Sequence, residues 1–206
     1  MVGAESTGTT TLTEAITEHY RRRFPRLADV TEYGRDYIYA KFGALQAKKP
    51  DAQLADMIWT EQDFGRIGAR QNAMENAAAD ACPLVIADTG SLATTLWERF
   101  YIGERSYGSY DGASKLPKRD IYLITDHEGV DFEDDGRREG EHRRADMTEW
   151  FEETLTDEGH SWILVTGDHD RRMKTAVEII DLILAQRSEF TSPPWATRTV
   201  LEGATR

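Results

Sequence analysis

The stretch that decides the fold is Gly3-Ala4-Glu5-Ser6-Thr7-Gly8-Thr9-Thr10. It fits the phosphate-loop pattern G-x-x-x-x-G-K-[ST] at every position except the lysine, where Thr9 stands. In such a loop the backbone N–H groups surround phosphate oxygens, the lysine contacts the β and γ phosphates, and the last hydroxyl binds Mg²⁺. The sequence therefore predicts a nucleotide site whose cofactor-binding residues are Gly3, Glu5, Ser6, Thr7, Gly8, Thr9, Thr10 and Thr11.

Composition narrows the class of protein. A chain of 206 residues is long enough for one well-cored α/β domain. The net charge of −12 argues against nucleic acid or an anionic membrane as the main partner. The one cysteine, Cys82, excludes a disulfide framework, and neither a membrane-spanning apolar run nor a signal peptide is visible. We therefore expect a cytoplasmic protein whose partner is a small molecule, and the sequence leaves the oligomeric state open.

Strand and helix patterns alternate along the chain. The strand candidates are 27–31, 84–87, 121–124 and 162–165. Helical patterns cover 10–24, 37–45, 52–80, 91–101, a segment after 144, and 171–186. This alternation predicts a doubly wound parallel α/β sheet of the P-loop NTPase and kinase type. We expect one nucleotide-binding domain over residues 1–187 and a disordered tail over 188–206.

The segment before the phosphate loop is unusually short. A P-loop kinase has a strand there, in the middle of its sheet, but only Met1 and Val2 precede Gly3. We therefore expect a truncated central strand, unpaired neighbouring strands and a large apolar slot between them. The interpretation favoured here is a wrongly assigned or truncated start, and the rival interpretation is a natural fragment that folds poorly.

Asp88 directly follows 84–87, the most hydrophobic of the strand candidates. Ligands of open α/β sheets bind beyond the carboxyl ends of the strands. A carboxylate at this place would hold Mg²⁺ through water, as a Walker-B aspartate does. The alternative role is a turn or helix-capping aspartate before Gly90. Given the phosphate loop, we favour the active-site role and predict Thr10 and Asp88 as the metal residues.

Glu32 and Arg35 follow the strand candidate at 27–31. A carboxylate in this position would accept a proton from a substrate hydroxyl, and the arginine would bind a phosphate or substrate oxygen. The alternative is an i,i+3 ion pair on the surface, which contributes only a few tenths of a kcal/mol.

Two further groups of arginines follow later strands. Arg137 and Arg138 lie, with Arg143 and Arg144, in a charged segment that would act as a lid over the transferring phosphoryl group. Arginines of this segment would then replace the missing lysine, or would be solvated beside the acidic residues around them. Asp168 and Arg171 follow the last strand candidate, where they would border the adenine ring.

Four motifs together resemble a known kinase family: Gly3-Ala4-Glu5-Ser6-Thr7-Gly8, Glu32-Tyr33-Gly34-Arg35, Ala87-Asp88-Thr89 followed by Ala93-Thr94-Thr95, and Asp134-Asp135-Gly136-Arg137. Over roughly residues 2–187 their order resembles the P-loop kinase domain of NadR-type ribosylnicotinamide kinases, within the AAA-like P-loop ATPases and kinases. The resemblance implies transfer of the γ-phosphoryl group of ATP, with Mg²⁺, to the 5′-hydroxyl of nicotinamide riboside. The catalytic residues would be Glu32, Asp88, Arg35, Arg137 and Arg138.

Thr9 is one departure from the family pattern, and the absent first strand is another. Removing one electrostatic donor of this kind costs on the order of 100- to 1,000-fold in rate unless another group compensates. The competing hypotheses are therefore an active small-molecule kinase and a non-catalytic or regulatory nucleotide-binding module. A P-loop ATPase or GTPase switch fits less well, because Glu32 and Arg35 suggest an acceptor site.

Overall fold

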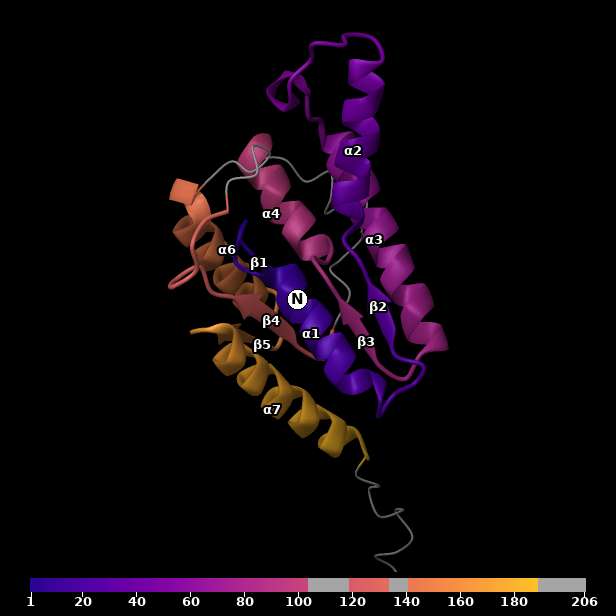
Figure 1. The fold of residues 1–206 in the computed structure, drawn as a ribbon, viewed down its shortest axis with the longest axis vertical. Helices are drawn as coiled ribbons and strands as arrows, with labels where there is room; N and C mark the ends of the chain where they lie inside the picture. Colours follow the sequence, from indigo (N-terminus) through magenta and orange to yellow (C-terminus); the bar gives the residue numbers. More distant parts are fainter. Residues whose placement is uncertain (104–118, 134–140, 189–206) are drawn as a thin grey trace, which may run out of the picture.

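The computed structural model describes residues 1–103, 119–133 and 141–188. In chain order the elements are β1 (Val2–Gly3), α1 (Thr9–Arg21), β2 (Ala28–Val30), α2 (Tyr33–Gln46), η1 (Leu54–Asp56), α3 (Glu61–Ala81), β3 (Val85–Ala87), α4 (Ser91–Tyr101), β4 (Tyr122–Thr125), η2 (Glu141–Arg143), α6 (Arg144–Asp157), β5 (Trp162–Val165) and α7 (His169–Ser188). Helices lie on both faces of a parallel sheet, which confirms the expected doubly wound α/β fold (Figure 1).

All strand pairs in the described residues are parallel. β4 lies between β1 and β5, and β2 pairs with β3. Met1 joins these two ladders, because its nitrogen donates to the Ala87 carbonyl at 2.6 Å and its carbonyl accepts from the Thr89 N–H at 3.1 Å. The strands therefore follow the order β2, β3, β1, β4, β5 across the molecule. The central strand that the sequence predicts to be truncated is present, but it spans only Val2–Gly3.

The core consists of two clusters of buried side chains. One cluster joins α1 and α7 to the strands through Leu12, Ile16, Tyr20, Ile86, Leu123, Val165, Ala176 and Ile180. The other joins α4 and α6 to β1 and β4 through Val2, Leu92, Leu96, Tyr122, Ile124, Met147, Phe151 and Leu155. Successive residues of β4 thus point into different clusters, which explains why this strand is apolar without alternation.

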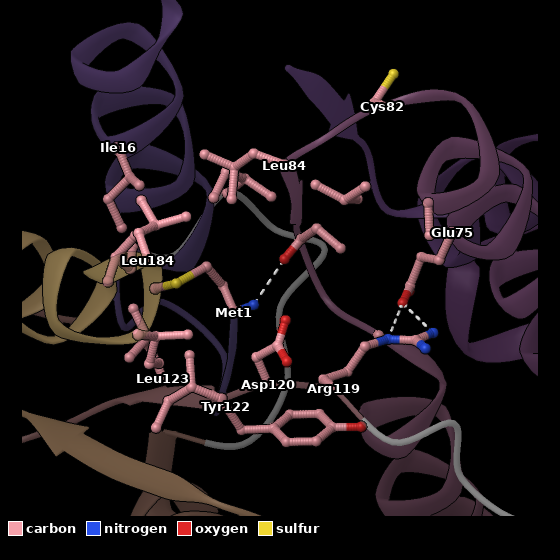
Figure 2. Close-up of a pocket in the computed structure, with 18 of the residues that line it drawn as sticks. Met1, Ile16, Glu75, Cys82, Leu84, Arg119, Asp120, Tyr122, Leu123 and Leu184 are labelled. Carbon is pink, nitrogen blue, oxygen red and sulfur yellow. Dashed lines mark hydrogen bonds and ion pairs between the residues drawn. The ribbon is translucent and has the colours of Figure 1, made fainter. Parts of the chain in front are cut away.

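A cavity of about 370 Å³ continues the line of β1 beyond Met1. Figure 2 shows Met1 at the edge of this cavity, with Leu84 above Met1 in this view and Leu123 of β4 below it. The ion pair between Glu75 and Arg119, at 2.5 Å, forms part of its wall. The apolar slot expected from the short first strand is therefore present as a cavity between β3 and β4.

The region predicted as one helix over 52–80 is instead a short η1 followed by α3. The chain leaves helical geometry at Met57 and Thr60, which have extended backbone angles. Thr60 begins α3 through a reciprocal capping box with Asp63, and the Trp59 ring packs 5.3 Å from the Phe64 ring. Side-chain capping therefore outweighs the continuous helical pattern. No helix in the described parts of the chain is long and apolar enough to cross a membrane.

Candidate nucleotide-binding site

The phosphate loop connects the end of β1 to the first turn of α1. Gly8 immediately precedes the helix with a left-handed backbone at φ 80°, and Ser6 also has a positive φ of 57°. Gly3 is required at its position because a Cβ there would overlap the hydroxyl oxygen of Thr125. The Thr7 hydroxyl closes the turn by donating to the Ala4 carbonyl at 2.8 Å. This geometry directs the loop to the N-terminal, electropositive end of α1.

The side chain at the lysine position is turned toward the sheet. The hydroxyl oxygens of Thr9 and Thr125 lie 3.1 Å apart, and those of Thr7 and Thr125 lie 2.6 Å apart. Thr9 therefore helps to fix the loop to the end of β4 and brings no positive charge. Thr125 was not predicted as a site residue, because it falls at the polar end of a strand and the contact spans more than a hundred residues.

The two predicted metal residues are in direct contact. The Thr10 hydroxyl donates to Oδ2 of Asp88 at 2.6 Å, and Asp88 is buried. The backbone N–H of Asp88 donates to the Val30 carbonyl at 2.8 Å, which fixes the carboxylate at the sheet edge. The N-cap residue of α4 is Gly90 and no side chain caps the helix, so Asp88 does not cap it. A hydroxyl and a carboxylate oxygen side by side suit the oxygen-ligand preference of Mg²⁺.

Glu32 and Arg35 form an ion pair at 3.4 Å, beside the start of α2. Glu32 is half-buried, whereas Arg35 is more exposed. Burial raises the pKa of the Glu32 carboxyl, Arg35 lowers it, and the negative charge of Asp88 raises it. The carboxylates at the ends of β2 and β3 are therefore close enough for one charge to act on the other.

An aromatic group lies beside this end of the sheet, where α3 and α4 pack together. The Tyr101 ring stacks with the Trp59 ring at a centroid distance of 5.8 Å and with the Trp97 ring at 6.0 Å. The ammonium of Lys41 lies 5.0 Å from the Trp59 ring centre.

Asp168 and Arg171 lie at the start of α7. One Asp168 carboxylate oxygen accepts the Arg171 backbone N–H at 2.9 Å, which is the geometry of a helix-capping residue. Both side chains are exposed, and neither has a hydrogen bond to the phosphate loop within the described residues. Thr11 is also exposed, on the first turn of α1. The predicted lid arginines, Arg137 and Arg138, lie outside the described residues.

Two arginines contact the loop directly, in a role that the sequence did not predict: Arg144, from the predicted lid segment, and Arg172, the residue after Arg171. Arg172 donates to the Thr7 carbonyl at 2.7 Å, and Arg144 donates to the Ser6 carbonyl at 3.1 Å. Both arginines are buried. A signal for Arg172 was present in the sequence, because it precedes the buried Ala176 by one helical turn and therefore lies on the inner face of α7.

Comparison with known proteins gives one family. The sequence model of the AAA domain family matches residues 1–172, which include the phosphate loop and the five strands of the described residues. No curated protein matches the chain.

Proposed function

The chain belongs to the AAA domain family, and we propose that it is an ATP-dependent kinase for the 5′-hydroxyl of nicotinamide riboside. Membership of this family indicates a P-loop nucleotide-binding module of the ATPase and kinase class. The observation that carries the proposal further is the 2.6 Å hydrogen bond between Thr10 and Asp88, with Glu32 near enough for its pKa to respond to Asp88. A phosphate site and a candidate base for an acceptor hydroxyl therefore meet at one end of the sheet. The choice of nicotinamide riboside rests on the resemblance of the Glu32-Tyr33-Gly34-Arg35 motif.

In this mechanism the loop N–H groups bind the phosphates of ATP. Thr10 and Asp88 would hold Mg²⁺, which neutralises phosphate charge when bound. Glu32 orients the acceptor hydroxyl and takes its proton, and a raised pKa suits a base that works near neutral pH. Arg35 stabilises the negative charge that develops on the transferring group. Catalysis is then mainly positioning and charge neutralisation.

The test is a direct assay of the full chain with MgATP and nicotinamide riboside. We expect nicotinamide mononucleotide and ADP in equal amounts, and a panel of other nucleosides measures the preference for the acceptor. Asp88→Asn should lower product formation by at least about 100-fold, whereas Asp170→Asn, an exposed acid on α7, should leave it unchanged. ATP binding without product or ATP consumption would overturn the kinase assignment.

The second candidate is a non-catalytic nucleotide-binding module. The observation that favours it is the position of Thr9, whose hydroxyl lies 3.1 Å from that of Thr125 where a kinase would present a lysine. This candidate predicts tight MgATP binding by calorimetry and no turnover with any nucleoside.

A further inference from the structure

We propose that Arg172 and Arg144 are positioning residues that hold the phosphate loop from behind, aim its N–H groups at the phosphates and compensate for the lysine absent at Thr9. This inference rests on the proposed nucleotide site, but it does not depend on which acceptor is phosphorylated. We call the two residues the arginine clamp.

Arg172 connects the loop to the ends of two strands. Its guanidinium donates to the carbonyls of Thr7 at 2.7 Å, Asp126 at 2.8 Å and Gly167 at 2.7 Å. These carbonyls belong to the phosphate loop and to the residues that follow β4 and β5. The side chain is only 4% exposed, so its charge acts with little screening by water.

Arg144 makes an equivalent set of contacts from the start of α6. It donates to the carbonyls of Ser6 at 3.1 Å, Val130 at 2.9 Å and His127 at 3.3 Å. The side chain is buried. Two successive carbonyls of the loop, those of Ser6 and Thr7, are therefore each held by a guanidinium from a different helix.

Peptide geometry converts these contacts into an effect on the nucleotide. In a trans peptide the N–H points away from the C=O of the preceding residue. Holding the Ser6 and Thr7 carbonyls therefore directs the N–H groups of Thr7 and Gly8 to the opposite side of the loop. Within the described residues these two N–H groups donate no hydrogen bond. A charged donor on a carbonyl also polarises the peptide and strengthens its N–H as a donor.

The charges of the clamp suit an anion at the loop. Within the described residues, the hydrogen bonds of the Arg172 guanidinium all go to neutral carbonyls. Burial lowers the pKa of Arg172, the Asp126 carboxylate raises it, and the charge of Arg144 lowers it. Two buried cations near one another favour negative charge around them, and the phosphates of a nucleotide would add to the charge that the Asp126 carboxylate already supplies.

The experiment measures MgATP affinity by calorimetry, together with the thermal midpoint, for the full chain and four variants. For Arg172→Gln we expect a Kd raised on the order of 10- to 100-fold at a temperature where the protein is folded. Arg172→Lys keeps the charge but loses the contact with three carbonyls. Its Kd should therefore lie between those of the unmodified chain and of Arg172→Gln. Thr9→Lys is the reference for the double variant Thr9→Lys, Arg172→Gln, in which the added lysine should restore most of the affinity that Arg172→Gln loses.

Arg119→Gln is the matched control. Arg119 also forms a short, partly buried contact, with Glu75, but it lies in the wall of the cavity rather than at the loop. Arg119→Gln should lower the thermal midpoint without changing the Kd for MgATP.

Each contrary result of this experiment rules out a different part of the proposal. An unchanged Kd in Arg172→Gln with a lower thermal midpoint overturns the clamp and leaves the nucleotide site standing. Weaker binding that Thr9→Lys does not restore overturns the compensation for the lysine. If the unmodified chain binds neither MgATP nor inorganic pyrophosphate, the proposed function fails and the clamp fails with it. Should Arg172→Gln not fold, Arg172→Lys and Arg144→Gln give the same comparison.

Discussion

At the scale of single residues, three charges act on one another at the end of β2 and β3. Burial raises the pKa of Glu32, Arg35 opposes this, and Asp88 adds to it. A carboxylate serves as a base only when it is deprotonated, so the reaction rate should fall as the pH drops through the raised pKa of Glu32. The acidic limb of the rate profile should therefore lie above the usual glutamate value of 4.5.

Arg35→Gln tests this coupling. Removal of the arginine takes away the attraction that lowers the pKa of Glu32, so the acidic limb of kcat should move to higher pH. The measurement is kcat with nicotinamide riboside as a function of pH. Arg22→Gln, an exposed arginine just after α1, is the control and should leave the limb in place. A limb that does not move in Arg35→Gln would show that Glu32 is not the base.

Asp88→Asn tests the same coupling from the other side. The amide keeps an oxygen for the Thr10 hydroxyl but loses the charge that binds Mg²⁺, so turnover should fall by at least about 100-fold. Because Asp88 raises the pKa of Glu32, the limb of the residual activity should move to lower pH, opposite to the Arg35 variant. Equal turnover in Asp88→Asn and the unmodified chain would contradict the metal role.

Residues of the site differ in how far the sequence could predict them. Thr10 and Asp88 follow from local patterns, a phosphate loop and a strand that ends in a carboxylate. Arg144 and Arg172 reach the loop from 138 and 165 residues away, and their partners are backbone carbonyls that carry no sequence signal. The sequence shows that Thr9 occupies the lysine position of the phosphate-loop pattern. Its contact with Thr125 cannot be predicted in the same way, because it depends on where β4 lies.

At the scale of elements, the start of α3 is the point where sequence periodicity and structure disagree. The Asp63 carboxylate accepts hydrogen bonds from the Thr60 backbone at 2.8 Å, the Thr60 hydroxyl at 2.7 Å and the Tyr37 hydroxyl at 2.7 Å, and pairs with Lys41 at 2.5 Å. Thr60→Ala removes one half of this capping box. We expect the free energy of unfolding to fall by about 0.5–2 kcal/mol, measured by urea denaturation. An unchanged midpoint would mean that tertiary packing alone begins the helix.

The Asp63 carboxylate also makes the stability of the folded protein depend on pH in the acidic range. Burial by itself would raise the pKa of Asp63, but hydrogen bonds from Lys41, Tyr37 and Thr60 outweigh it and hold the pKa at about 2. A lowered pKa in the folded state stabilises the protein above the usual value of 3.8, and this contribution is lost as the pH falls toward 2. Between these values Asp63→Asn should lose stability less steeply than the unmodified chain. Asp51→Asn, an exposed acid, should follow the unmodified chain.

At the scale of the whole molecule, the sequence predicted the class of fold but not the manner in which the sheet is completed. The four apolar strands and their alternation with helices follow from hydrophobic patterns. The joining of the two ladders through Met1 does not, since it depends on two backbone hydrogen bonds, to Ala87 and from Thr89. The cavity beside Met1 could be predicted from the short β1. Its polar wall of Glu75 and Arg119 could not, because it depends on where α3 packs.

The position of the cavity allows us to predict where residues added before Met1 would lie. Val2 pairs with Ile124, so the same register places Met1 opposite Leu123 and an added residue opposite Tyr122. On the other side the Met1 nitrogen already donates to the Ala87 carbonyl, a bond that a peptide N–H would keep. Burial lowers the pKa of the Met1 ammonium, which shows that a charge is unfavourable at this point. An extended apolar segment would therefore both fill space and remove a buried charge.

We accordingly expect four added residues of the type Val-Ile-Val-Ile to stabilise the chain, whereas Ser-Asn-Ser-Asn should not. Each large apolar side chain that is buried contributes about 1.5–3 kcal/mol, against about 1–2 kcal/mol for ordering each backbone residue. A net gain of about 2 kcal/mol would raise the thermal midpoint by roughly 4–8 °C in a chain of this size. Differential scanning calorimetry of the two extensions measures the difference, and the polar extension controls for loss of the terminal charge. Equal midpoints would mean that the walls of the cavity close on themselves, because an open slot between β3 and β4 gains energy only from a strand with apolar side chains.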